Sequence, residues 1–404
     1  MHDGSAVGEV QSVEIRSGIS LHFMGEGGIL FDWEAQRLYG TNTMATFIWC
    51  HLENGLPLSA IAQLVGETFA VSAVDATTHV ALSLDQWRAL GLLGSQGIWA
   101  PGPADRTTRI RRQPSSTVPP TSRQCPVASH EYRLLDTSFR LSFSSRLLLS
   151  EVAPVLTPLA DATGEAREDL HLVATADRIA LCHEGIAIDD CQGWDGVVPM
   201  LKAALVLFAL DRSDDFAAVH AAAVIRDGRC FLIPGESGQG KSTLSAALVA
   251  AGFCLLGDDT IVLARETLNA RAIPFSICLK EGSWPLLASR FPALAERPVH
   301  LRGDGKLVRY LAPGRDGGWA APSLQTPVDG IVLLARGTGQ PAGLALLDPV
   351  EAFPRFLQDF YPLRGGLDAA KVERLVQWMG QRRCAELRYD TLEEGVSLMR
   401  MLCS

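Results

Sequence analysis

The sequence predicts an α/β protein in which a small winged-helix domain is followed by a linker and a P-loop nucleotide-binding domain with a small α+β lead-in. Three observations predict this class. They are a strand pair followed by three amphipathic helices, a proline-rich stretch, and a phosphate-loop motif between an apolar strand and a helix. The domains are expected at 1–96, 97–130, 131–214 and 215–404.

The composition excludes some classes of function and partner. Hydrophobic residues make up 47% of the chain and charged residues 20%, as in a globular protein, and a net charge of −9 does not favour a nucleic-acid partner. The nine cysteines have no metal-binding spacing and are expected to be reduced thiols. No signal-peptide pattern is present, and the longest apolar run, 198–210, is too short to span a bilayer and contains Lys202. We expect a cytoplasmic protein without a membrane partner.

Turn signals and helical periodicity predict the elements of the N-terminal domain. Residues 13–16 are compatible with a short strand, and 28–31 with 37–39 predict a hairpin. Three helices follow. The residues expected at their ends are Thr41 or Asn42 with Gly55 for the first, Pro57 for the second, and the capping box of Ser72 and Asp75 for the third.

A hairpin with three short helices is a winged-helix arrangement, and most winged helices bind DNA. The third helix carries only Arg88 as a basic residue near its end, which is too few for phosphate contacts. Residues 21–93 instead resemble the PqqD family, in the motifs at 28–31, 38–49, 58–62 and 90–93. The resemblance implies a domain that binds the leader of a ribosomally synthesised precursor peptide as an added strand on the hairpin edge, packed on the third helix.

The stretch 97–130 is expected to be an extended tether, because its prolines and polar residues cannot bury enough apolar surface to fold. Its five arginines could pair with an acidic peptide, although a solvated linker is the simpler interpretation. The lead-in is expected to have strands at 132–135, 139–143, 170–174 and 178–182, with helices at 150–160 and 194–210. Its histidines, His171 and His183, are interpreted as solvent or core residues.

The central motif is Gly235-Glu-Ser-Gly-Gln-Gly-Lys-Ser242, which fits the phosphate-loop pattern G-x-x-x-x-G-K-[ST] without a mismatch. An apolar strand at 229–234 precedes it and a helix at 242–251 follows. Glycine can take backbone angles that turn successive N–H groups toward an anion, and the helix start directs its positive end there. Lys241 adds a cation, and Ser242 offers a hydroxyl to Mg²⁺. The expected nucleotide-binding residues are Gly235, Glu236, Ser237, Gly238, Gln239, Gly240, Lys241, Ser242 and Thr243.

Asp258 and Asp259 separate two apolar strands within 253–263. Adjacent ionised carboxylates repel each other at the end of a buried strand, and Mg²⁺ beside a triphosphate would relieve that repulsion. We assign the metal to Asp258 with Ser242, while the second carboxylate accepts a hydroxyl proton. A solvated turn is the alternative. His220 lies in the apolar run 217–224, expected as a strand just before the loop strand.

His220, the loop and Gly257-Asp-Asp259 together resemble the HPr kinase/phosphorylase family over about 217–262. The resemblance implies a P-loop kinase that uses ATP and Mg²⁺ to phosphorylate serine, with Asp259 or Asp258 as the general base and His220 supporting the developing charge. The family's second signature is replaced by the sequence at 273–283, which puts HPr and phosphorolysis in doubt. The chain looks more like divergent relatives found beside modified-peptide genes, including lasso-peptide kinases. The family's hexamers suggest a homo-oligomer.

Four further residues are candidates for contacts with substrate or phosphate. Lys280 and Glu281 lie just past an apolar strand, where a surface turn explains them equally well. Lys306 and Arg309 could clamp a phosphate or an acidic peptide end.

The sequence therefore predicts an ATP-dependent serine kinase of a precursor peptide in modified-peptide biosynthesis, with Lys241 and Mg²⁺ neutralising the triphosphate. Two alternatives stay open. One is a kinase of a carrier protein or small molecule, and the other is a nucleotide-gated peptide chaperone that transfers no phosphate.

Overall fold

The computed structural model describes residues 13–94, 126–160, 166–175, 178–312, 318–335 and 340–403. The chain forms two compact units, and the polypeptide passes from one to the other after residues 104, 347, 357, 365 and 381. The first unit thus combines the N-terminal part with 348–357 and 366–381. The expected linker at 97–130 lies mostly outside the described residues, and the boundaries at 96, 130 and 214 stay predictions.

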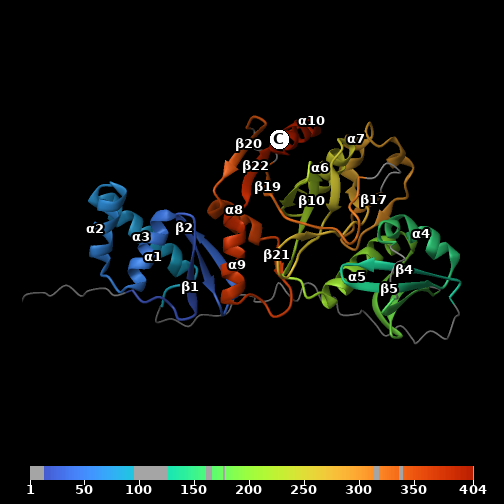
Figure 1. The fold of residues 1–404 in the computed structure, drawn as a ribbon, viewed down its shortest axis with the longest axis horizontal. Helices are drawn as coiled ribbons and strands as arrows, with labels where there is room; N and C mark the ends of the chain where they lie inside the picture. Colours follow the sequence, from blue (N-terminus) through green and yellow to red (C-terminus); the bar gives the residue numbers. More distant parts are fainter. Residues whose placement is uncertain are drawn as a thin grey trace, which may run out of the picture. The chain divides into compact units, whose positions relative to one another are not determined.

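The N-terminal part of the first unit is a three-stranded antiparallel sheet followed by three helices (Figure 1). The predicted hairpin and all three helices are confirmed. Asn42 caps the first helix and Ser72 the third, as expected. The elements are β1 (Ile19–Met24), β2 (Gly27–Asp32), β3 (Arg37–Thr41), α1 (Thr43–Glu53), α2 (Leu58–Phe69) and α3 (Ala73–Ala89).

The strand β1 was not predicted, because in it the usual alternation of apolar side chains facing the core and polar side chains facing solvent is inverted. His22 is buried on this strand whereas its neighbour Phe23 is exposed. The strand expected at 13–16 was wrong, since Ile15 makes only an isolated bridge to Leu93.

Two helices from the far end of the sequence, α8 (Pro349–Leu357) and α9 (Ala369–Gly380), pack on this sheet (Figure 1). Their contact is close. A Cβ on Gly40 would lie 2.7 Å from Pro354 Cγ, and a Cβ on Gly27 would lie 2.9 Å from Val350. His22 Nδ1 bonds Glu373 Oε2 at 2.9 Å, which explains why this histidine is buried. Glycine on β2 and β3 therefore permits the approach of α8.

The lead-in of the second unit is a five-stranded sheet in the order β4-β5-β6-β7-β8, covered by two helices. Its strands are β4 (Ala128–Leu134), β5 (Thr137–Phe143), β6 (Glu168–Ala174), β7 (Ile179–His183) and β8 (Ile186–Cys191), and its helices are α4 (Arg146–Leu156) and α5 (Val197–Arg212). Two short 3-10 helices, η2 (Thr157–Leu159) and η3 (Trp194–Gly196), flank them.

Four predicted strands of the lead-in are confirmed, and β8 was missed. The start of α4 was wrong: Ser145 caps it, so the helix begins four residues before the expected start. The residues 128–130, expected in the linker, belong to β4. The buried side chains of this sheet form one hydrophobic cluster with Val262 and Phe275 of the part that follows, so the two parts share a core.

The phosphate-loop part of the second unit, which holds the motif at 235–242, is built on two sheets with the orders β12-β10-β11-β19-β22-β20 and β18-β14-β13-β9-β21. In the first, β11, β19 and β22 run parallel. The strands are β9 (Ala217–Val219), β10 (Ala221–Arg226), β11 (Arg229–Pro234), β12 (Cys254–Gly257), β13 (Ile261–Leu263), β14 (Ala270–Arg271), β18 (Gln325–Thr326), β19 (Gly330–Ala335), β20 (Gly343–Leu347), β21 (Phe360–Pro362) and β22 (Arg383–Arg388).

A smaller sheet, in the order β15-β17-β16, completes this part. Helix α6 packs on β10, and α10 packs on α6. The remaining elements are β15 (Ile277–Lys280), β16 (His300–Leu301), β17 (Leu307–Leu311), α6 (Lys241–Ala250), α7 (Trp284–Leu287), α10 (Leu392–Cys403), η4 (Glu281–Ser283) and η5 (Pro292–Glu296).

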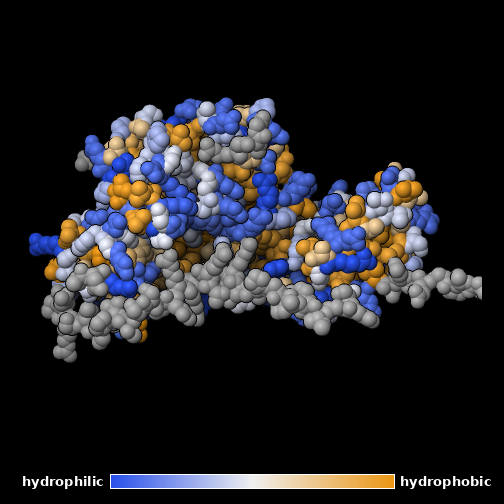
Figure 2. All heavy atoms as spheres, turned by 180° about the vertical axis from the view of Figure 1, so that it is seen from behind, coloured by the Kyte–Doolittle hydropathy of each residue, from blue (hydrophilic) through white to orange (hydrophobic). Residues whose placement is uncertain are grey.

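Two expectations for this part need correction. The run 217–224 is two strands in different sheets, not one. The last part of the chain, 349–403, contributes β21 and β22 as well as three helices, although the sequence pattern of 350–402 is mostly that of helices. Among the described helices none has the length and apolar character needed to cross a membrane. Hydrophilic and hydrophobic residues are interspersed over the face in Figure 2.

Candidate active site

The phosphate loop connects β11 to α6 as predicted. Gly235, Gly238 and Gly240 have φ angles of +147°, +107° and +92°, a region that residues with a side chain rarely adopt. A Cβ on Gly235 would lie 2.2 Å from Gln239 Oε1, so this glycine also lets the loop close on itself. Gly240 is the N-cap of α6 without a side-chain cap bond, which leaves the first N–H groups of the helix directed at an anion.

Lys241 is only 5% exposed and its ammonium lies against the loop. Its Nζ donates to the carbonyl oxygens of Gly235 and Glu236, the latter at 3.1 Å. Burial lowers the pKa of Lys241, and nearby carboxylates counteract that effect. These carboxylates belong to Asp359, Asp259 and Asp258.

Two bends bring the other catalytic candidates to the loop. The chain leaves one sheet for the other between β9 and β10, where His220 lies, and again between β12 and β13, where Asp258 and Asp259 lie. Because β9 pairs with β13 and β10 with β12, the two bends are neighbours. The order of strands thus joins residues that are far apart in the sequence.

His220 lies between the aspartate bend and the lysine. Its Nδ1 is 2.8 Å from the carbonyl oxygen of Asp259, which can only accept, so Nδ1 carries the hydrogen. The Asp259 carboxylate lies 3.5 Å from the same nitrogen. Nε2, 3.2 Å from Lys241 Nζ, is then the acceptor of an ammonium hydrogen. The imidazole therefore fixes both the aspartate and the lysine.

Asp258 is buried, 2% exposed, and its Oδ1 has no hydrogen-bond partner among the described residues. Burial raises the pKa of this carboxyl, whereas Lys202 and a hydrogen bond from Ser242 favour its charged form. Ser242 and Asp258, the predicted metal ligands, therefore lie side by side. A buried carboxylate oxygen without a partner is a suitable ligand for a cation.

Mg²⁺ fits these residues. It takes few protein ligands and completes its shell with phosphate oxygens and water. Among the residues that the structure describes, no group of three or more His, Cys, Asp and Glu could hold a metal. One hydroxyl and one carboxylate beside a phosphate loop are the few protein ligands that Mg²⁺ takes. The cation would neutralise phosphate charge when bound.

Asp259 differs from its neighbour in exposure and backbone. Its side chain is 53% exposed, and its φ of +84° is unusual for a residue with a side chain. Such strain persists where surrounding contacts enforce it, and it is often found at functional sites. Here it directs two successive carboxyl groups to different places, one buried and one open.

Three cavities meet around this bend. The phosphate cavity, about 360 Å³, contains the loop and Lys241, and the aspartate cavity, about 650 Å³, contains Asp258 and Asp195. Asp259 lines both of them, together with Cys278 and Arg302. The apolar cavity, about 770 Å³, shares His220 and Ser237 with the phosphate cavity.

Besides Gly235, Lys241 and Ser242, the predicted nucleotide-binding residues have mixed positions. Ser237, Gly238, Gly240 and Thr243 line the phosphate cavity, and Thr243 also bonds Ser283 Oγ at 2.7 Å. Gln239 does not line it, and Glu236 lines the apolar cavity instead.

Of the four further candidates, only Lys280 lines the phosphate cavity, where its Nζ donates to Ser237 Oγ at 2.6 Å. Glu281 begins η4 and is exposed. Lys306 is paired with Asp304 at 3.3 Å, and the Arg309 guanidinium lies 4.2 Å from the ring centre of Trp284. The last three line neither the phosphate nor the aspartate cavity.

Sequence reasoning missed several residues of this region. Arg302, Cys278 and Lys202 line the aspartate cavity. The backbone oxygen of Asp359 accepts a hydrogen bond of 2.6 Å from the backbone N–H of His220. A signal existed for Lys202, a single charge within an apolar helix. No local pattern marks the others, because folding alone brings them to the loop.

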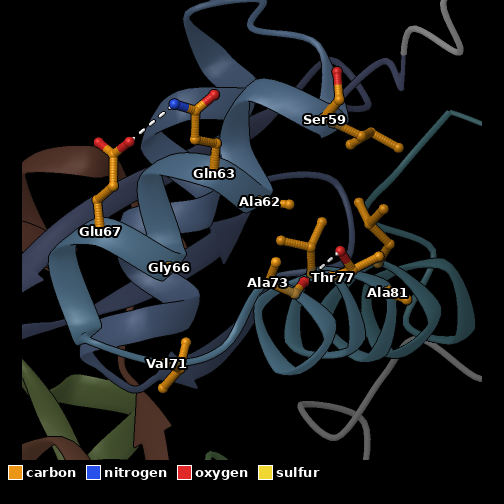
Figure 3. A pocket seen from close by; sticks show the side chains of 12 residues that line it. Ser59, Ala62, Gln63, Gly66, Glu67, Val71, Ala73, Thr77 and Ala81 are labelled. Atoms are coloured by element: carbon orange, nitrogen blue, oxygen red, sulfur yellow. Dashed lines mark hydrogen bonds between the residues drawn. The ribbon is translucent and has the colours of Figure 1, made fainter.

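The N-terminal unit has a groove of its own between α2 and α3, about 710 Å³ in volume (Figure 3). Its lining is mostly apolar, with Ala62, Val71 and Ala81 in view. Gln63 bonds Glu67 at 2.9 Å along its rim. Separately, β3 is an edge strand of the sheet, so one side of its backbone has no strand partner among the described elements.

Comparisons with known proteins bear on both units. Residues 27–93 match the family model described as coenzyme PQQ synthesis protein D (PqqD), which confirms the predicted PqqD-like domain. The comparison with curated proteins finds no match.

Among solved structures, the chain is similar to the Hpr(Ser) kinase/phosphatase from Coxiella burnetii, with 16% identity over 46% of this chain and 97% of that chain. The TM-score of 0.23 is too low to support any detail of the site. The function is therefore argued from the residues themselves.

Proposed function

We propose that this protein is an ATP- and Mg²⁺-dependent kinase that phosphorylates a serine hydroxyl of a ribosomally synthesised precursor peptide held by its leader. The observation that carries the proposal is the position of Asp259, which lines the phosphate cavity and the neighbouring aspartate cavity at once. A residue placed there can contact a donor and an acceptor together. Modified-peptide biosynthesis, lasso peptides included, is the proposed setting.

Each residue then has a role that follows from its surroundings. The loop N–H groups and Lys241 hold the terminal phosphates, and Ser242 with Asp258 would hold Mg²⁺. Mg²⁺ supplies charge neutralisation during transfer. Asp259 accepts the proton of the serine hydroxyl while His220 keeps its backbone in place. Positioning and electrostatics supply most of the rate enhancement in phosphoryl transfer.

The leader would bind to the PqqD-like domain through the edge of β3, as an added strand that packs on α3. Holding the leader raises the effective concentration of the remaining peptide near the catalytic residues. A cytoplasmic location and a homo-oligomeric state stay predictions from the sequence.

The test is mass spectrometry of a candidate precursor peptide incubated with the full chain, ATP and Mg²⁺. We expect the peptide to gain one phosphate on serine, and a peptide without its leader to react at least tenfold more slowly at low concentration.

The same experiment distinguishes the alternatives. Equal rates with and without the leader would indicate a kinase of another substrate. ATP consumption without any gain in acceptor mass would indicate a nucleotide-gated chaperone and would contradict the kinase proposal.

A further inference from the structure

The stretch 358–365 lies between α8 and α9 in the sequence but belongs to the second unit. It contains β21, which pairs with β9 in antiparallel fashion. The backbone hydrogen bond of 2.6 Å from His220 to Asp359 extends this pairing by one residue. The register therefore places Asp359 directly opposite His220, at the bend that adjoins the phosphate loop.

The side chains of Asp359 and His220 lie on the same face of this pair of strands, because directly opposite residues of an antiparallel ladder share a face. Both side chains line the apolar cavity. From the same face His220 reaches the lysine of the loop, with its Nε2 3.2 Å from Lys241 Nζ. Asp359 is 5% exposed, so a buried carboxylate stands on the side from which the buried ammonium is held.

The Asp359 carboxylate also interacts with the start of the phosphate loop. Burial raises the pKa of this carboxyl, and the charge of Glu236 adds to that effect. His220 and Lys241 favour its ionised form instead, as does a hydrogen bond from the backbone of Gly235. The carboxylate therefore lies beside the first glycine of the loop as well as beside its lysine.

Lys241 is a buried cation, and a buried cation keeps its charge best beside a carboxylate. Burial lowers the pKa of Lys241, and three carboxylates raise it, Asp359 the most and Asp259 and Asp258 less. In the proposed reaction Asp258 would hold Mg²⁺ and Asp259 would accept the serine proton. Of these three carboxylates, Asp359 is thus the one that stays with the lysine during the transfer.

Asp359 lies outside the cavities in which the reacting groups would meet. It lines the apolar cavity but neither the phosphate cavity nor the aspartate cavity. A carboxylate in this place acts on the reaction through the residues that it holds.

We propose that Asp359 is a positioning residue for phosphoryl transfer. Its carboxylate keeps the Lys241 ammonium and the first glycine of the loop in place, and its backbone oxygen keeps His220 in place. This inference rests on the proposed function and adds to it a residue from a distant part of the sequence. Charges that are fixed before the reaction stabilise the transition state most, and a displacement of about 1 Å can cost about 10²-fold in rate.

The test is the isosteric variant Asp359→Asn in the full chain, with ATP, Mg²⁺ and a candidate precursor peptide. Phosphopeptide and released ADP are both measured. We expect kcat to fall by about ten- to a hundredfold, because Lys241 loses its carboxylate. The KM for ATP should not rise, because the substitution removes a negative charge near the triphosphate.

Asp214→Asn is the matched control. It removes an exposed carboxylate that lies 3.1 Å from Arg364 of the same stretch, and it should keep both kcat and the KM for ATP. The asparagine oxygen in Asp359→Asn can still accept from Gly235, so the variant removes the charge while the hydrogen bond can persist.

A double-mutant cycle tests whether the effect passes through the lysine. If Asp359 acts through Lys241, Asp359→Asn should lower the residual rate of the Lys241→Ala variant by less than about twofold. A carboxylate that acts independently of the lysine would give the same fold loss in both backgrounds.

The outcomes separate this inference from the proposed function. An unchanged kcat, a KM for ATP that rises as much as kcat falls, or equal losses in both backgrounds would contradict the positioning role and leave the kinase intact. ADP release without phosphopeptide in the wild type would contradict the kinase, while the effect of Asp359→Asn on ADP release would still test the positioning role. A wild type that releases no ADP would contradict both proposals.

Discussion

The phosphate cavity and the aspartate cavity are lined by different kinds of groups. The phosphate cavity is formed by the loop, with glycines at positive φ, and by the buried Lys241. The aspartate cavity is formed by carboxylates and apolar side chains from several segments. The shape of the first cavity therefore depends on backbone geometry, whereas the lining of the second depends on side chains that can be exchanged. Substitutions should separate the two.

The largest effect is expected for Lys241→Ala. The ammonium is the buried cation of the loop, so its loss should reduce phosphoryl transfer by at least about 10³-fold. Radiolabelled transfer measures it. Lys306→Ala removes an exposed lysine outside the phosphate cavity and should keep near-normal activity. A similar loss in both variants would show that the loop lysine has no special role.

Asp259→Asn removes the carboxylate that borders both cavities. We expect transfer to fall by about 10²- to 10⁴-fold, because the proton acceptor is lost, while ADP still binds. Single-turnover kinetics and calorimetric titration with ADP measure the two properties. Asp211→Asn, at an exposed position on α5, is the control. If ADP affinity fell as much as the transfer rate, Asp259 would belong to the donor site alone.

Gly235→Ala tests whether the phosphate cavity depends on its backbone. The new Cβ would meet Gln239 Oε1, and a φ of +147° is unfavourable for alanine, so ADP affinity should fall by about tenfold or more. Gly343→Ala, whose nearest heavy atom is 4.0 Å away, should change nothing. Equal ADP affinity in wild type and Gly235→Ala would mean that the loop tolerates a side chain.

The smallest effect concerns the junction between the lead-in, which supplies α5, and the phosphate-loop part. Arg271 bonds both oxygens of Asp136, at 2.7 Å and 2.8 Å, and this bonding lowers the pKa of Asp136. Its contribution to stability is therefore present above the unfolded-state pKa of about 3.9 and is lost as pH falls through the lower folded-state pKa.

Asp136→Asn should thus destabilise the protein by about 0.5–1 kcal/mol near neutral pH, since the aspartate is largely exposed, and the difference from wild type should shrink below about pH 4. Denaturant unfolding across pH measures it. A difference that grew in acid would mean that the carboxyl is not stabilised by Arg271.

The sequence predicted the features whose residues are contiguous in the chain. The loop, its flanking strand and helix, and the aspartate bend follow from local pattern, and the capping residues of α1 and α3 were read correctly. Sequence reasoning missed the features that depend on tertiary packing. Arg302 lies in a loop without a motif, the single charge of Lys202 within an apolar helix was not interpreted as part of the site, and β1 was hidden because α9 makes burial of His22 favourable.

Two further features could not be read from local pattern. The run around His220 was expected to be one strand, yet the chain changes sheets there, and no alternation of side chains signals a change of sheet. Arg309 was a candidate contact for a phosphate or an acidic peptide end, and nothing in the sequence indicates that its guanidinium lies 4.2 Å from the ring centre of Trp284.

The packing of α8 and α9 on the N-terminal sheet limits how this protein can be re-engineered. Excising residues 1–96 would uncover Val350, Pro354 and the partner of His22, so a loss of activity in such a fragment would not report on peptide capture. A chimera that takes the PqqD-like domain of another protein would have to exchange both helices along with the three strands. The recipient's own Asp359, two residues beyond the end of α8, would have to stay in place.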